Sequence, residues 1–180
     1  MGGLHNIENV LAAIVIALEL NIDDEKIKSA IADFKGVKRR FEYVIKNEGM
    51  VMIDDYAHHP QELEALISGA KNLYPERKCT VVFQPHLFSR TRDFADDFAK
   101  ALSLADELVL LPIYPARELP MEGVTSQLIF DKVNLVKKKM LDANGLRDYL
   151  KNGKAEMLVM CGAGDIDAMV TPVKKILEKN

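Results

Sequence analysis

The sequence predicts an α/β protein with a largely parallel sheet covered by helices on both faces, preceded by a short helical segment. Two observations lead to this fold class. From residue 41 onward, short apolar runs rich in β-branched residues alternate with stretches of helical periodicity. Before residue 41 the pattern is helical only. Strands that alternate with helices usually form a parallel sheet with both faces buried.

Two amphipathic helices come first. The first has apolar residues at helical spacing and is expected to begin near Asn6, with Asn6 as its N-cap; its apolar positions are Ile7, Val10, Leu11, Ile14, Val15 and Leu18. The second follows the acidic residues Asp23 to Glu25, which suit a first helical turn, and ends at Gly36. We therefore place a boundary near residues 36 to 40, which gives two units, 1–36 and 37–180.

The second unit contains the alternating pattern. Strands are predicted at 41–45, 50–53, 80–84, 107–111, 156–160 and, more weakly, 134–136, with helices at 60–73, 93–104, 143–150 and 165–177. The first two strands are separated by Asn47-Glu48-Gly49, which suits an antiparallel hairpin at the sheet edge. Residues 111–127 hold three prolines and a glycine and are predicted to form one long ordered loop.

Composition limits the classes of function. A chain of 180 residues that is 48% hydrophobic can form one domain, or one domain and a piece of another. Its net charge of -3 provides no sequence-wide attraction to nucleic acid or to an anionic membrane, and no apolar stretch is long enough to cross a bilayer. Cys79 and Cys161 have no metal-ligand spacing, so buried reduced thiols in a cytoplasmic protein are expected. Because a functional-looking cluster follows Met1-Gly2-Gly3 directly, we expect a piece of a longer protein.

Polar residues gather after four of the predicted strands. They are Asp54, Asp55, Tyr56, His58 and His59 after the second strand, His86, Ser89, Arg90 and Arg92 after the third, Tyr114, Arg117 and Glu118 after the fourth, and Gly162 to Asp165 after the strand at 156–160. Ligands of open α/β sheets bind outside the carboxyl ends of the strands. These four loops are therefore predicted to meet on one rim, suited to a nucleotide and to a carboxylate or phosphate.

Each cluster also has an ordinary structural explanation. His59 can precede a helix that starts at Pro60, and an aspartate can serve in the turn. Arg90 and Arg92 can be solvated surface charges. The run Gly162-Ala163-Gly164 can be a tight strand-to-helix turn rather than an anion cradle. The joint occurrence of two histidines, two carboxylates and several arginines favours a site.

Six segments in order resemble the carboxyl-terminal part of the Mur ligases. They are GLHNIENVLAA, FKGVKRRFEY, DDYAHHP, VFQPHLFSRT, IYPARE with GVTS, and CGAGDID. The resemblance spans nearly the whole chain and implies a Rossmann-like domain preceded by the helical end of a central ATP-binding domain. DDYAHHP also fits the member that recycles a murein tripeptide, whereas QPHLFSRT with IYPARE and GVTS points to the member that adds L-alanine to UDP-N-acetylmuramate.

The resemblance implies an ATP-dependent ligase of peptidoglycan biosynthesis. In this family ATP phosphorylates the substrate carboxylate, the amino acid attacks the acyl phosphate, and magnesium neutralises the phosphates. Such chemistry needs positioning and stabilisation of spread negative charge. The chain contains no glycine-rich P-loop with its lysine and threonine. We therefore expect the N-terminal and central domains to hold most of the ATP and magnesium, and this chain alone to be inactive.

The resemblance also assigns roles to residues. Asn6 and Asn9 resemble adenine contacts, Arg40 the arginine that reaches the ATP phosphates, and Asp55 the ribose ligand. Residues around the incoming amino acid and the reacting carboxylate are matched by Tyr56, His58, His86 and Arg90. Arg40, His58 and His86 are the expected catalytic residues. Some members have a basic residue after the histidine of QPH, but here it is Leu87.

Two other functions remain open from the sequence. The chain can be a binding module that holds a nucleotide or an amino acid without chemistry. It can also belong to a ligase that accepts a tripeptide, a choice that residues 112–127 would influence. His5 and Asp54 are left without a role.

Overall fold

Residues 4–179 of the chain are described in a computed structural model, apart from the side chains of residues 4–6. The elements are α1 (Leu4–Glu19), α2 (Asp24–Asp33), β1 (Glu42–Lys46), β2 (Val51–Asp55), α3 (Pro60–Leu73), β3 (Cys79–Phe83), α4 (Phe88–Asp93), α5 (Ala95–Leu102), β4 (Glu107–Leu110), α6 (Gln127–Lys132), β5 (Lys138–Met140), α7 (Ala143–Asn152), β6 (Met157–Cys161) and α8 (Asp167–Leu177). The expectation attached to Met1-Gly2-Gly3 lies outside the described residues.

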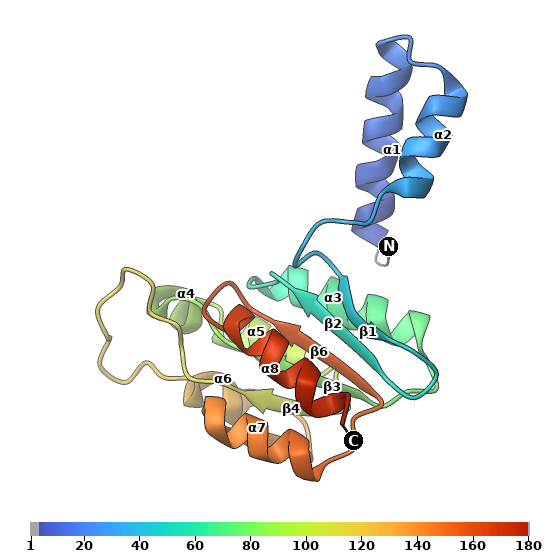
Figure 1. Ribbon diagram of the computed structural model, residues 1–180. Helices are drawn as coiled ribbons and strands as arrows, with labels where there is room; N and C mark the ends of the chain where they lie inside the picture. The colour runs from blue at the N-terminus through green and yellow to red at the C-terminus, as the bar shows by residue number, and fades with distance from the viewer. Residues whose placement is uncertain (1–3, 180) are drawn as a thin grey trace.

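The six strands form one sheet in the order β1-β2-β6-β3-β4-β5 (Figure 1). β1 pairs with β2 antiparallel, and every other pair is parallel. Val51, Met52 and Ile53 of β2 lie opposite Met157, Leu158 and Val159 of β6. The predicted fold class and the antiparallel edge hairpin are therefore confirmed.

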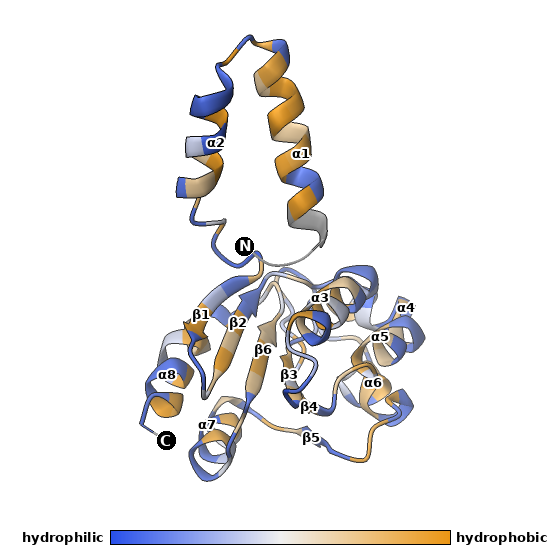
Figure 2. Cartoon of the chain, turned by 90° about the vertical axis from the view of Figure 1, so that its right-hand side faces the viewer, coloured by the Kyte–Doolittle hydropathy of each residue, from blue (hydrophilic) through white to orange (hydrophobic). Residues whose placement is uncertain are grey.

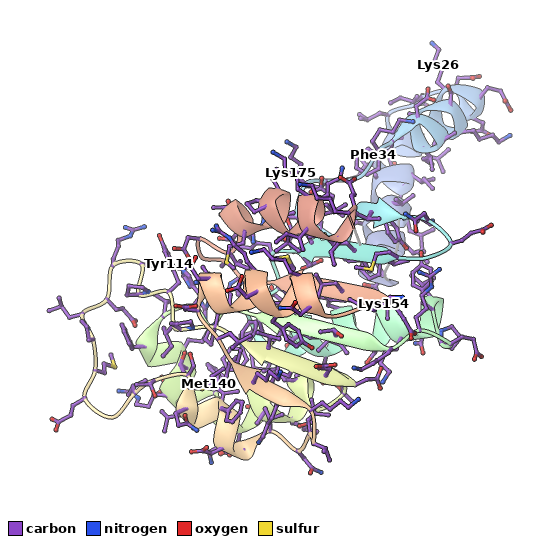
Figure 3. All side chains as sticks on the ribbon, turned by 60° about the horizontal axis from the view of Figure 1, so that its bottom comes forward. Lys26, Phe34, Tyr114, Met140, Lys154 and Lys175 are labelled. Atoms are coloured by element: carbon purple, nitrogen blue, oxygen red, sulfur yellow. The ribbon has the colours of Figure 1, made fainter. Side chains whose placement is uncertain are left out.

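Two helical layers bury the sheet. Alternate residues of each central strand belong to two hydrophobic clusters, because neighbouring side chains of a strand point to opposite faces. The cluster of Ile53, Val81 and Phe83 includes residues of α3, α5 and α6, and the cluster of Met52, Val82 and Val109 includes residues of α7 and α8. Figure 3 shows the side chains of α7 and α8 on their face of the sheet.

The structure differs from the predicted elements in three places, one strand that is wrong and two short helices that were not predicted. The weak strand at 134–136 is wrong, since Val136 is fully exposed and the last strand is β5, where Lys138 lies opposite Leu108 of β4. An edge strand can carry lysines because one of its sides faces solvent. A prediction based on apolar content therefore overlooks such a strand. The helix predicted at 93–104 is confirmed as α5, but α4 before it was not predicted, and Phe94 separates the two helices with φ -119° and ψ 21°. α6 lies in a segment for which no helix was predicted.

α1 and α2 form a hairpin that stands away from the sheet in Figure 1. α1 begins at Leu4, so the prediction of Asn6 as its N-cap is wrong, whereas Asp23 caps α2 by accepting the amide N–H of Glu25 at 3.1 Å. Figure 2 shows α1 as mostly hydrophobic, yet Ile16 is 61% exposed and no described residue of α2 is buried. Phe34, labelled in Figure 3, is also exposed.

No helix within residues 4–179 is both long and apolar enough to cross a membrane. Cys79 and Cys161 are free and buried in the sheet, and burial raises the pKa of the Cys79 thiol to about 12. Both thiols are therefore protonated and unreactive at neutral pH. This agrees with the expectation of buried reduced cysteines.

Candidate functional site

The candidate site lies at the carboxyl ends of β2, β6, β3 and β4, which are neighbours in the sheet. The chain leaves β6 toward α8 on one face and leaves β3 toward α4 and α5 on the other. A crevice for ligands forms where successive connections take opposite faces. The predicted meeting of four loops on one rim is therefore confirmed.

A row of aromatic rings crosses this rim. The ring centroids of Tyr56 and His58 are 5.2 Å apart, those of His58 and His86 are 6.0 Å apart, and those of His86 and Tyr114 are 5.8 Å apart. The guanidinium of Arg90 lies beside the row, with Nη1 3.5 Å from Nδ1 of His86. The structure thus brings together the four residues predicted to surround the amino acid, and adds Tyr114.

Local backbone geometry positions His86 and Tyr114. The two residues form a parallel bridge beyond the ends of β3 and β4, so the sheet continues for one more pair. The amide of Tyr114 donates to the carbonyl of Pro85 at 2.8 Å, and the amide of Leu87 donates to the carbonyl of Tyr114 at 3.0 Å. Leu87 adopts φ 72°, which turns the chain from this bridge into α4.

The electrostatic environment keeps His86 neutral. Burial, followed by the nearby charges of Arg90 and His58, lowers the pKa of His86 below its usual 6.5. A neutral imidazole at neutral pH has a nitrogen lone pair that can accept a proton. His86 is therefore suited to act as a base beside Arg90, which can pair with an oxyanion.

His58 and His59 immediately precede α3, and Glu62 in its first turn contacts both residues. The carboxylate of Glu62 accepts the amide N–H groups of His58 at 2.9 Å and His59 at 3.1 Å. Its Oε2 also lies 3.3 Å from Nδ1 of His58. His59 precedes Pro60, the first residue of α3, as predicted from the His59-Pro60 pair.

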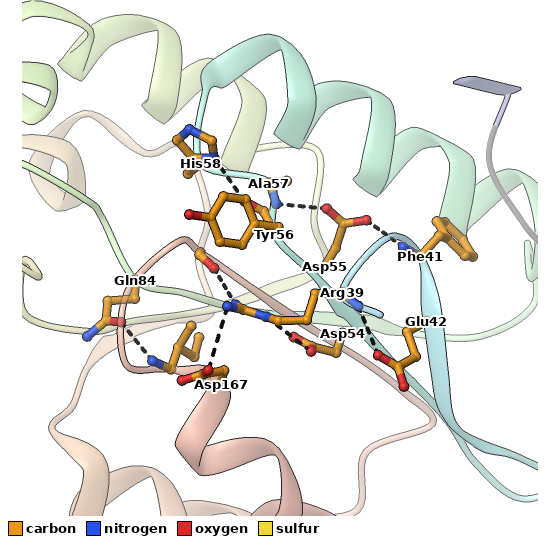
Figure 4. Close-up of polar contacts among 12 residues, drawn as sticks. Arg39, Phe41, Glu42, Asp54, Asp55, Tyr56, Ala57, His58, Gln84 and Asp167 are labelled. Carbon is orange, nitrogen blue, oxygen red and sulfur yellow. Dashed lines mark hydrogen bonds and ion pairs between the residues drawn. The ribbon is translucent and has the colours of Figure 1, made fainter. Parts of the chain in front are cut away.

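The two aspartates at the end of β2 have different partners, as Figure 4 shows. Asp54 forms an ion pair with Arg39, with 3.4 Å between Oδ2 and Nε. Asp55 accepts the amides of Phe41 and Ala57, each at 2.7 Å. The ribose hydroxyls expected at Asp55 would therefore share carboxylate oxygens that already bind the backbone.

Gln84 holds the turn after β6. Its side-chain amide donates to Asp165 at 2.7 Å and accepts the amide of Ile166 at 3.0 Å. A Cβ atom on Gly164 would lie 2.5 Å from Oε1 of Gln84 and 2.6 Å from Cβ of Tyr114. This close packing accounts for the glycine and supports the tight-turn explanation of the Gly162-Ala163-Gly164 run.

The remaining predicted contacts lie apart from this row. Arg40 is exposed in the linker before β1, and Asn9 is exposed on α1. The backbone of Asn6 belongs to α1, and its side chain and that of His5 are outside the described residues. The structure does not bring either asparagine into the aromatic row.

Sequence reasoning missed the contributions of Arg39, Glu62 and Gln84. Arg39 stands next to the selected Arg40, and Gln84 stands two residues before His86, so both were within conspicuous motifs. Glu62 follows His59 by three residues, which is the spacing at which a glutamate accepts amide groups at a helix start. That spacing is a signal that could have identified it.

The chain is similar to known proteins in both sequence and fold. Residues 39–168 match the family described as Mur ligase, glutamate ligase domain. UDP-N-acetylmuramate–L-alanine ligase of Parabacteroides distasonis is 52% identical over 174 residues, which cover 97% of this chain and 38% of that protein. The enzyme of the same name from Flavobacterium psychrophilum is 51% identical over 177 residues, with 98% and 40% covered.

A solved structure is similar over nearly the whole chain. UDP-N-acetylmuramate-alanine ligase from Thermotoga maritima gives a TM-score of 0.80 at 28% identity, covering 99% of this chain and 39% of that chain. A murein peptide ligase from Psychrobacter arcticus has the same fold at a TM-score of 0.67 and 20% identity, covering 100% and 38%. This chain thus spans 38% to 40% of the length of these relatives. The family match over residues 39–168 shows that the chain belongs to the Mur ligase family.

Proposed function

We propose that this chain is the carboxyl-terminal part of an ATP-dependent ligase that joins L-alanine to UDP-N-acetylmuramate in peptidoglycan biosynthesis. In this proposal residues 1–36 are the end of a central ATP-binding domain and residues 37–180 are the carboxyl-terminal domain. The observation that carries the proposal is that Tyr56, His58, His86 and Arg90 lie together at the rim, in a chain so similar to the two alanine-adding enzymes.

The roles of the row follow from its chemistry. Arg90 pairs with the carboxylate of the incoming amino acid, since a guanidinium binds a carboxylate through two parallel hydrogen bonds. His86, which is neutral because of its environment, takes a proton from the ammonium group so that the amine can attack the acyl phosphate. The rings of Tyr56 and His58 lie beside His86 and contact the bound amino acid.

In this proposal the nucleotide is bound between the carboxyl-terminal domain and the central ATP-binding domain, which faces it. Arg40, exposed in the linker, contacts the phosphates; Asp55 contacts the ribose; Asn6 and Asn9 contact the adenine. A magnesium ion neutralises the phosphates when bound. No group of three or more His, Cys, Asp or Glu within the described residues is placed to hold a metal ion. In this proposal the central domain provides the ligands of the ion.

A chimeric enzyme tests the proposal. The chain replaces the matching segment of the Parabacteroides distasonis relative, and phosphate release from ATP is measured with UDP-N-acetylmuramate and L-alanine. We expect L-alanine-dependent turnover that falls by at least about a hundredfold in Arg40→Ala and in His86→Ala, the usual cost of removing one catalytic group. A folded chimera that uses a tripeptide instead of L-alanine would favour the recycling activity.

A binding measurement on the isolated chain distinguishes part of a ligase from a complete binding module. Calorimetric titration of ATP and of L-alanine into the 180-residue chain should show weak binding or none, because half of the site is on the facing domain. Tight binding of either molecule to the isolated chain would contradict the proposal. It would show that the rim is a complete site by itself.

A further inference from the structure

The linker between α2 and β1 takes an unusual path on both sides of Arg40. Arg39 has φ 57° and Phe41 has φ 50°, so each adopts the left-handed region. A residue with a side chain adopts this conformation at a cost in free energy, because its Cβ lies too close to the following carbonyl oxygen. Two such residues within three positions persist only where their surroundings hold them.

The side chain of Arg39 provides the first of these attachments (Figure 4). Its guanidinium donates to the carbonyl of Gly162 and lies 3.4 Å from Oδ2 of Asp54 and 4.0 Å from Oδ2 of Asp167. It also lies over the ring of Tyr56, 5.1 Å from the centroid. One side chain thereby connects the linker with the end of β2 and with the turn between β6 and α8.

Backbone groups provide the second attachment. The amide of Phe41 donates to Asp55 at 2.7 Å, and the Phe41 ring is buried. The carbonyl of Arg39 accepts the amide of Tyr56 at 2.7 Å. The Asp54-Asp55 pair therefore holds the residues on both sides of Arg40, while the side chain of Arg40 itself is exposed.

From this arrangement we propose that Arg39 is a positioning residue. Paired with Asp54, it holds the linker in one conformation and so fixes the direction of the Arg40 side chain. The inference rests on the proposed function only for what Arg40 contacts. Arg39 suits this role because a planar guanidinium can bind several acceptors at once, whereas a lysine ammonium acts as a point charge on a flexible stem.

Amide hydrogen exchange in the 180-residue chain tests the attachment without requiring activity. In Arg39→Gln we expect the amides of Arg40 and Tyr56 to exchange at least about tenfold faster, since their acceptors, the carbonyls of Val37 and Arg39, lie in the linker. The amide of Val81 in the core should keep its rate. Arg39→Lys should give intermediate rates because it keeps the charge and loses the fork.

Arg77→Gln is the matched control. Arg77 also donates to backbone carbonyls, those of Asn47, Glu48 and Glu156, but far from the linker in sequence. It should leave the exchange of Arg40 and Tyr56 unchanged. Unchanged exchange at these two amides in Arg39→Gln would overturn the proposal. Equal acceleration throughout the sheet would also overturn it, because Arg39 would then contribute only to global stability.

Kinetics in the chimeric enzyme separate this inference from the proposed function. Arg39→Gln should lower kcat by about tenfold, because a misdirected Arg40 impairs the phosphate side. Arg39→Lys should restore part of the loss. If Arg40→Ala has no effect, the role proposed for Arg40 fails while the exchange result stands. If Arg40→Ala abolishes turnover and Arg39→Gln does not change it, the positioning role fails.

Discussion

Asp54 and Arg39 form a nearly buried ion pair at the end of β2, with 3.4 Å between Oδ2 and Nε. Asp54 is 4% exposed, and its other oxygen, Oδ1, has no hydrogen-bond partner among the described residues. A buried carboxylate with incomplete hydrogen bonding is costly to ionise. The pair therefore orders the linker at some expense in stability.

The first prediction concerns the pH dependence of stability at Asp54. Burial raises the pKa of Asp54 from 3.8 to about 6, against the lowering effect of Arg39 and with raising effects from Glu42 and Asp55. A carboxyl whose pKa is raised by folding binds more protons in the folded state, so its contribution to stability falls as pH increases from about 4 to 6. Asp54→Asn should remove this contribution.

The measurement is the free energy of unfolding in urea, compared between wild type and Asp54→Asn from pH 4 to 8. The difference between the two proteins should shift in favour of the variant as pH rises through the interval between 3.8 and about 6. A difference that is constant over this interval would contradict the prediction.

The second prediction concerns Glu62 at the start of α3. Burial would raise the pKa of Glu62, but the amide groups of His58 and His59 and the positive charges of His58 and Arg40 hold it below its usual 4.5. Its stabilising contribution is therefore present above pH 4.5 and is lost as pH falls through the lowered folded value. Glu62→Gln should cost about 1 kcal/mol at pH 7, comparable to a lost helix cap.

Thermal or urea unfolding at pH 7 and at pH 3 checks this, with Glu64→Gln as the control. Glu64 is an exposed residue of the same helix, so its substitution should change stability little at either pH. Equal effects of the two substitutions would show that Glu62 does not anchor the start of α3.

The third prediction concerns the packing of Gly164. Its missing side chain makes room for Gln84 and Tyr114, and an added Cβ would lie at 2.5 and 2.6 Å from them. Gly164→Ala should therefore lower the free energy of unfolding by about 1–3 kcal/mol, the usual cost of overpacking. Gly49→Ala is the control, because the nearest atom to its added Cβ would be 3.6 Å away. A stability loss confined to Gly49→Ala would contradict the packing argument.

The fourth prediction concerns the protonation of His86. An NMR titration should give a midpoint below 6.5 for this ring, because it is partly buried and lies near Arg90 and His58. Arg90→Gln should raise that midpoint by removing one of the nearby positive charges. Arg117→Gln, an exposed arginine of the following loop, should not. A midpoint unaffected by Arg90→Gln would remove the electrostatic basis of the role proposed for His86.

Much of the fold was predictable because it depends on local patterns. The positions of β2, β3, β4 and β6 follow from apolar runs bounded by polar loops. β5 was not predictable in this way, since an edge strand with Lys138 and Lys139 resembles a surface segment. α4 was not predicted, since six residues are too few to show a helical period.

The candidate site was also predictable only in part. Sequence alone determined which residue types gather at the rim, because parallel strands place their carboxyl ends along one edge of the sheet. Tertiary structure decided which partners each member of the adjacent pairs Arg39-Arg40 and Asp54-Asp55 contacts. The left-handed turns at Arg39 and Phe41 place one arginine, partly shielded from solvent, against Asp54 and leave Arg40 exposed. The sequence shows two adjacent arginines with equal charge, and only the backbone path and the partners across the sheet distinguish them.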